Sequence, residues 1–138
     1  MNRDEILRDI KDSLGIVPKF FEDLPDANLE DEWRLVKRMR QGETVIPKKY
    51  RALIGLGVAA ALQCRYSSLA KTEAARMFGA TEEEIKDALL VAKHTAGWST
   101  YMGGLQYDFD LFKRELEQMR RFTEEKQKKK EVVGDGRY

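Results

Sequence analysis

Three reactive side chains lie close together in the sequence: the thiol of Cys64, the hydroxyl of Ser67 and the ammonium group of Lys71. Their spacing is i, i+3 and i+7, and residues so spaced share one face of a helix. A helix that begins near Cys64 would direct unpaired backbone N–H groups at the sulfur, favouring the thiolate and lowering the thiol pKa. Ser67 could donate a hydrogen bond to that thiolate, and Lys71 could add positive charge. The stretch is therefore a candidate site for thiol chemistry.

A second interpretation makes Cys64 inert. No glycine or proline separates Leu62 from Cys64, so residues 47–78 could form one continuous helix. Cys64 would then lie in mid-helix, where no unpaired N–H group is left to stabilise a thiolate. Free cysteines are also among the most buried residue types in proteins. From these residues alone, both interpretations stay open.

His94 is the fourth candidate and the only histidine in the chain. Leu90, Val91 and Trp98 lie near it on the same predicted helix, beside the main apolar stripe. An ordinary histidine on a helix surface explains this pattern. Alternatively, His94 lines the same pocket as Cys64 and serves there as a base.

Composition excludes several other kinds of site. One cysteine and one histidine cannot supply a disulfide within the chain, a Cys-x-x-Cys pair or a zinc site of the usual type, so we expect no metal and no cofactor. The 25 basic and 24 acidic residues nearly cancel, which disfavours a nucleic-acid partner. The longest apolar run covers residues 52–62, whereas a membrane span needs about 20 residues. With a polar amino terminus besides, the sequence indicates a cytoplasmic protein that contacts neither membrane nor nucleic acid.

The elements that must position these residues are helices. Apolar residues recur at helical spacing along the chain, and no segment alternates as a strand would. We therefore expect an all-α, single-domain bundle of about six helices over residues 1–130, followed by a flexible tail over residues 131–138. Small residues crowd the helix that follows Pro47, and close packing between helices explains them.

The sharpest local signal is a capping box, in which Thr81 precedes a helix and Glu84 can reach back to it. The helix that it opens is expected to run to about Gly97. A pair of glycines at positions 103–104 is expected to break the chain again, and the last long helix to begin at Leu105.

Residues 47–99 resemble the carboxymuconolactone decarboxylase and alkylhydroperoxidase D-like family. Three stretches carry the resemblance in order: PKKYRALIGLGVAAALQC at residues 47–64, GATEEEIKDAL at residues 79–89, and AGWS at residues 96–99. The resemblance implies an all-helical, alkylhydroperoxidase D-like fold that assembles into homo-oligomers, often trimers or hexamers. It also implies a helix break just before Cys64.

Redox-active members of that family carry a glutamate, then eleven residues, then Cys-x-x-Cys, three residues and a histidine. On this chain the first cysteine of the motif falls on Cys64, the second on Ser67, the histidine on Lys71 and the glutamate on Ala52. Without a second thiol, no disulfide can close, so the two-cysteine mechanism is excluded. A protonated lysine is also a poor base unless it is desolvated.

Three functions stay open. The first is a one-cysteine, thiol-dependent peroxidase or related redox enzyme that uses Cys64. The second is an enzyme of the same fold that acts on a small carboxylated or lactone-like substrate, with Arg65, Lys71 and His94 binding or protonating it. The third is a non-catalytic, oligomeric binding protein, which the three departures from the motif favour.

Overall fold

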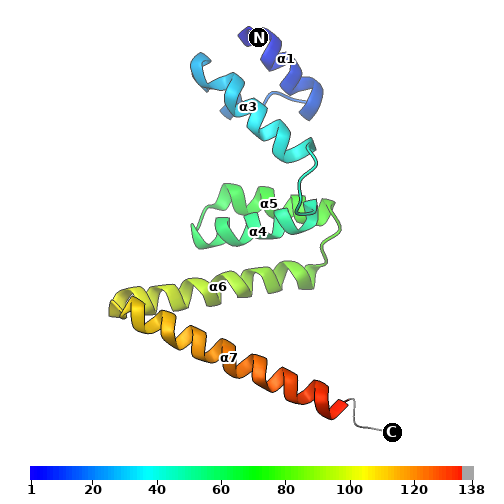
Figure 1. Ribbon diagram of the computed structural model, residues 1–138. Coiled ribbons are helices and arrows are strands. Elements are labelled where there is room, and N and C mark those ends of the chain that lie inside the picture. The colour runs from blue at the N-terminus through cyan, green and yellow to red at the C-terminus, as the bar shows by residue number, and fades with distance from the viewer. Residues whose placement is uncertain (135–138) are drawn as a thin grey trace. The chain divides into compact units, whose positions relative to one another are not determined.

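The computed structural model describes residues 1–134, and this part of the chain consists of helices joined by short connections (Figure 1). The helices are α1 (Arg3–Leu14), α2 (Lys19–Glu22), α3 (Asp26–Gln41), α4 (Lys48–Ala61), α5 (Arg65–Met77), α6 (Glu82–Leu105) and α7 (Phe109–Gly134). The expected all-α fold is confirmed. The described residues hold seven helices rather than about six, because the aromatic stretch between Pro18 and Pro25 forms the single turn of α2.

The chain divides into two compact units, an N-terminal unit over residues 1–52 and a C-terminal unit that begins at Leu53. The boundary lies within α4, and each unit is described by itself. The single domain that the sequence predicts over residues 1–130 stays a prediction. None of the helices in the described part of the chain combines the length and the hydropathy that crossing a membrane would need.

The N-terminal unit has a closed apolar core, in which α1 packs against α3. The core residues are Ile6, Ile10, Phe21, Leu29 and Trp33, each at most 5% exposed. The Phe21 and Trp33 rings meet edge to face with centroids 5.6 Å apart, an arrangement that aromatic quadrupoles favour.

Polar contacts at the edge of this core hold α1 to α3. Trp33 donates its indole N–H to Asp9 Oδ2 at 2.7 Å, and Lys37 Nζ lies 2.8 Å from the same oxygen. These two donors lower the pKa of Asp9. The start of α1 is fixed by a capping box between Asn2 and Glu5.

The C-terminal unit has a much smaller core. Its buried residues are Leu56, Ala59, Ala75 and Ile85. The small residues of α4 do allow close approach: a Cβ added at Gly57 would lie 3.7 Å from Ala92 Cβ on α6. The expectation of close helix packing is therefore confirmed at this position.

The predicted start of α6 is confirmed, but its predicted end is wrong. Thr81 accepts the N–H of Glu84 at 3.0 Å, and the Glu84 carboxylate accepts the N–H of Thr81 at 3.1 Å. The helix then continues through Gly97 and the glycine pair at 103–104, and it ends at Gln106, whose φ is +52°. A glycine costs a helix only about 1 kcal/mol, and without a proline the surrounding helical hydrogen bonds carry the helix past it.

The last helix also differs from expectation at both ends. It begins at Phe109 rather than Leu105. At this start, Asp108 Oδ1 accepts the N–H of Leu111 at 2.7 Å. It extends through Gly134, so residues 131–134 of the predicted tail are helical. Residues 135–138 of that tail lie outside the described part of the chain.

Candidate functional site

A break between α4 and α5 positions Cys64. The helix α4 ends at Ala61, and Gln63 adopts the left-handed conformation with φ +54°. The Gln63 N–H donates to the carbonyl of Ala60, and the Cys64 N–H donates to the carbonyl of Ala59, each at 3.0 Å. These bonds close the carboxyl end of α4 as left-handed helix caps do. Residues 47–78 are therefore two helices, and the continuous-helix interpretation is wrong.

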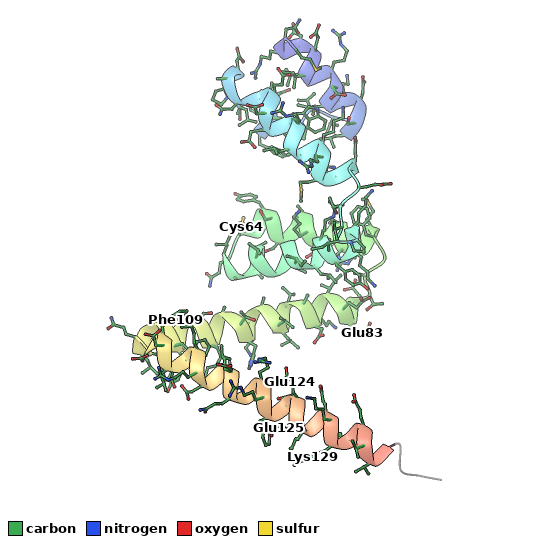
Figure 2. All side chains as sticks on the ribbon, viewed as in Figure 1. Cys64, Glu83, Phe109, Glu124, Glu125 and Lys129 are labelled. Carbon is green, nitrogen blue, oxygen red and sulfur yellow. The ribbon has the colours of Figure 1, made fainter. Side chains whose placement is uncertain are left out.

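Cys64 is the N-cap residue of α5, with extended backbone angles of φ −90° and ψ 106°. Its sulfur accepts the backbone N–H of Ser67 at 3.5 Å. Figure 2 shows the labelled side chain at the turn that joins α4 to α5. The thiol thus occupies the place where serine or aspartate usually caps a helix.

The surroundings of Cys64 favour its thiolate. The backbone N–H of Ser67 lowers the pKa of the Cys64 thiol most, followed by a hydrogen bond with the Ser67 hydroxyl, and the backbone N–H of Tyr66 adds to both. Partial burial of the sulfur opposes them, but the net pKa lies below its ordinary value. The structure therefore brings Cys64 and Ser67 together in the manner that the spacing predicts.

Lys71 lies one turn beyond Ser67 on α5, with its aliphatic stem across α4. A Cβ added at Gly55 would lie only 2.9 Å from Cδ and Cε of Lys71. Gly55 thus leaves the space that the lysine stem occupies. The groups that lower the pKa of Cys64 belong to Ser67 and Tyr66, not to Lys71.

His94 lies in a different place. It is exposed on α6, where its Nε2 accepts the indole N–H of Trp98 at 3.2 Å and the two rings meet edge-on. Tyr101 continues the stripe, with its ring centroid 6.0 Å from that of Trp98. The open pocket around His94 is lined by residues of α6, and Cys64 is not among them. The pocket around His94 therefore does not include Cys64, contrary to the alternative interpretation that places the two residues in one pocket.

Sequence reasoning missed an apolar groove between α4 and α6, with a volume of about 560 Å³. Leu53, Ile54 and Val58 line it from α4, and small residues such as Ala92 and Ala96 line it from α6. The available signal was the run of small residues in α4, which the sequence interpretation explains by close packing between helices. Within residues 1–134, no three His, Cys, Asp or Glu side chains gather in a way that could hold a metal ion.

Comparison with known proteins gives one family and one solved structure. The sequence profile of the carboxymuconolactone decarboxylase family matches residues 31–107. The crystal structure of the alkylhydroperoxidase AhpD core from Rhodospirillum rubrum is similar, with a TM-score of 0.64 and 25% sequence identity. The alignment covers 76% of this chain and 80% of that one. A search of curated proteins gave no match.

Proposed function

This chain belongs to the carboxymuconolactone decarboxylase family, and we propose that it is a one-cysteine, thiol-dependent peroxidase that uses Cys64. The observation that carries the proposal is the capping position of the sulfur, which receives N–H and O–H hydrogen bonds at the start of α5. Thiolates are the nucleophilic form of cysteine, and helix N-termini stabilise them. The fold likeness to an alkylhydroperoxidase core supports the same class of chemistry.

The proposed reaction has two stages. The Cys64 thiolate attacks one oxygen of a peroxide, the O–O bond breaks, and the leaving oxygen takes a proton from solvent to become an alcohol or water. The sulfur is thereby oxidised to a sulfenic acid. One external thiol then forms a mixed disulfide with Cys64 and releases water, and a second external thiol regenerates the Cys64 thiol while the two external thiols leave as a disulfide.

Two neighbouring side chains take supporting roles. The Ser67 hydroxyl donates to the thiolate, and it cannot act as a resolving group because it carries no sulfur. Lys71 adds a positive charge on the same helix, which favours approach of an anionic peroxide or thiol. A reducing cytoplasm would supply the external thiol that this mechanism requires.

We also propose that the protein works as a homo-oligomer, of which the resemblance suggests a trimer or hexamer. The C-terminal unit exposes apolar side chains on two successive turns of α4, where Ile54 is 56% and Val58 55% exposed, and just after the helix, where Leu62 is 74% exposed. Apolar stripes of this kind are typical of surfaces that another protein covers.

Peroxide consumption tests the proposal directly. The wild-type protein should consume an organic hydroperoxide in the presence of dithiothreitol, and Cys64→Ser should lose this activity while keeping the helical circular dichroism signal. Ser67→Ala should slow the reaction severalfold, because the thiolate loses the hydroxyl hydrogen bond. Ser68→Ala is the matched control, because Ser68 lies next to Ser67 on α5 but has no part in the proposal. This variant should leave the rate unchanged.

Alkylation by iodoacetamide gives an independent measurement. Its rate should rise with pH around a midpoint below the ordinary cysteine value of about 8.5, and Ser67→Ala should move that midpoint upwards. A midpoint at the ordinary value together with no consumption of peroxide would contradict the proposal.

The open pocket beside His94 supports a second candidate, an enzyme that acts on a small carboxylated or lactone-like substrate. Lys93, Trp98 and Tyr101 also line that pocket, and they offer a cation and aromatic faces to such a molecule. Turnover of a lactone that survives Cys64→Ser but not His94→Ala would favour this candidate. If the wild-type protein neither consumes peroxide nor turns over a lactone, a non-catalytic binding protein is favoured.

A further inference from the structure

The helix α7 presents an apolar face that the described chain leaves largely exposed. It has 26 residues, none of them buried. Phe109 is 69% exposed, Leu116 45% and Met119 55%. In water, most of the stability of such a helix comes from packing its apolar face against a partner. The family match ends at residue 107, so this helix belongs to the part of the chain that the family profile does not describe.

The apolar residues of α7 follow a heptad. Phe109, Phe112, Leu116 and Met119 are separated by three, four and three residues, which places them at consecutive a and d positions. We call these four residues the α7 seam. Thr123 and Lys126 occupy the next two positions of the repeat, so the apolar seam ends after Met119.

The charges that flank the α7 seam distinguish between orientations of a partner helix. The two g positions beside the seam are acidic, Asp108 and Glu115, and the two e positions are basic, Lys113 and Arg120, whereas the next g position beyond the seam is Phe122. In a parallel pair each g residue faces the e residue of the following heptad on the partner, so Asp108 meets Lys113 and Glu115 meets Arg120. In an antiparallel pair g faces g and e faces e, so like charges would oppose one another.

We propose that α7 packs in parallel against α7 of a second copy of this chain, through the α7 seam. Tyr107 fixes the first turns of the helix, because it packs its ring edge-on against Phe112 and donates its hydroxyl to Glu115. Beyond the seam, Lys126 would face its own symmetry mate and repel it. The pairing is therefore confined to the first half of α7. Figure 2 marks the two halves by Phe109 near the start of the helix and by Glu124, Glu125 and Lys129 along the second half.

Disulfide trapping in the full-length chain tests the orientation. In a Cys64→Ser background, which removes the only native thiol, Met119→Cys should form a disulfide-linked dimer under mild oxidation. Position 119 meets itself across the axis only in a parallel, in-register pair. Leu116→Cys is a second seam variant and should cross-link as well. Gln118→Cys is the matched control, because its side chain points away from the seam, and it should stay unlinked.

Two results of the trapping experiment would overturn the proposal. One is that Met119→Cys and Leu116→Cys both keep a free thiol after oxidation while the protein keeps its helicity. The other is equal cross-linking at position 118, which indicates random collision instead of a defined contact. Because this assay follows disulfide formation and not turnover, its outcome is separate from the fate of the proposed peroxidase activity.

Charge reversal tests the flanking pairs by sedimentation equilibrium. Glu115→Arg should raise the dissociation constant of the assembly at least severalfold, because Arg120 of the other copy then faces a like charge. Adding Arg120→Glu should restore most of the affinity. Tyr107→Phe separates the two roles of Glu115, since it removes the hydroxyl bond but keeps the carboxylate, and it should weaken the assembly less than Glu115→Arg does. A double variant as weak as Glu115→Arg alone would refute the parallel pairing.

Discussion

The two units of this chain differ in how far they bury their tryptophan side chains and the residues around them. The N-terminal unit buries Trp33, Phe21 and Leu29 within its own helices. The C-terminal unit leaves Trp98 54%, Tyr101 59% and Leu90 58% exposed. The difference indicates that the first unit is stabilised by its own core, whereas the second leaves large apolar side chains exposed, as surfaces that bind another molecule do. The candidate thiol site belongs to the second unit.

The two tryptophans give the strongest test of this contrast. Trp33 is 4% exposed, so Trp33→Ala should lower the free energy of unfolding by about 3–5 kcal/mol, the usual cost of emptying a core aromatic site. Trp98→Ala should cost less than about 1 kcal/mol, because the side chain is 54% exposed. Urea denaturation at low protein concentration measures both effects. Equal losses of stability in the two variants would contradict the difference in packing between the two units.

Acid should weaken the N-terminal unit through Asp9. Hydrogen bonds from Lys37 and Trp33 lower its pKa in the folded state. Its contribution to stability is therefore complete above the unfolded value near 3.9 and is lost as pH falls through the lowered folded pKa. At neutral pH, Asp9→Asn should cost about 1 kcal/mol, and it should flatten the acid dependence. Trp33 fluorescence in a Trp98→Phe background, followed from pH 7 downwards, measures this dependence for the N-terminal unit alone.

Capping boxes occur in both units and should matter equally. Asn2 caps α1 in the first unit, and Thr81 caps α6 in the second. Asn2→Ala and Thr81→Ala should each cost about 1 kcal/mol, as measured by thermal unfolding, whereas Thr81→Ser should retain most of the stability. A much larger loss at one cap would show that the two units differ in their helix ends as well as in their packing.

Two glycines of α4 test the packing of the C-terminal unit through the smallest expected changes in stability. Gly57→Ala should stabilise the protein by about 0.5–1 kcal/mol, because the added Cβ would meet only Ala92 at an ordinary contact distance. Gly55→Ala should gain less, since the Lys71 stem must move away from the new Cβ. Paired urea titrations compare the two, and a larger gain at Gly55 would contradict the tight contact with Lys71.

Local signals predicted much of the fold. The Thr81 capping box and the helical repeats gave the correct helix type and several helix starts, because caps and amphipathic stripes act within a few residues. A second capping box, at Asn2 and Glu5, follows the same spacing and could have been found in the same way. Helix ends at glycines were harder to predict. The helix expected to end at about Gly97 continues through it, because a helix tolerates a single glycine.

The candidate site was harder to predict, for a physical reason. The break before Cys64 depends on Gln63 in the left-handed conformation, and glutamine carries no such signal in sequence. Only the family resemblance anticipated it. His94 could not be placed either, because helical spacing fixes the face of α6 on which a residue lies but not what that face meets. Sequence periodicity likewise does not predict that Ile54 and Val58 are exposed, because it does not identify what the face of α4 meets.

The helical hairpin of α1 and α3 has a kinetic consequence. Its core joins residues that lie near one another along the chain, from Ile6 to Trp33, so little loop-closure entropy opposes its formation. Chains dominated by such local contacts fold in microseconds to milliseconds. Meeting a second copy, by contrast, takes a time that depends on protein concentration. We therefore expect the hairpin to be complete before the proposed pairing with a second copy, which would be the slow step and the one that dilution delays.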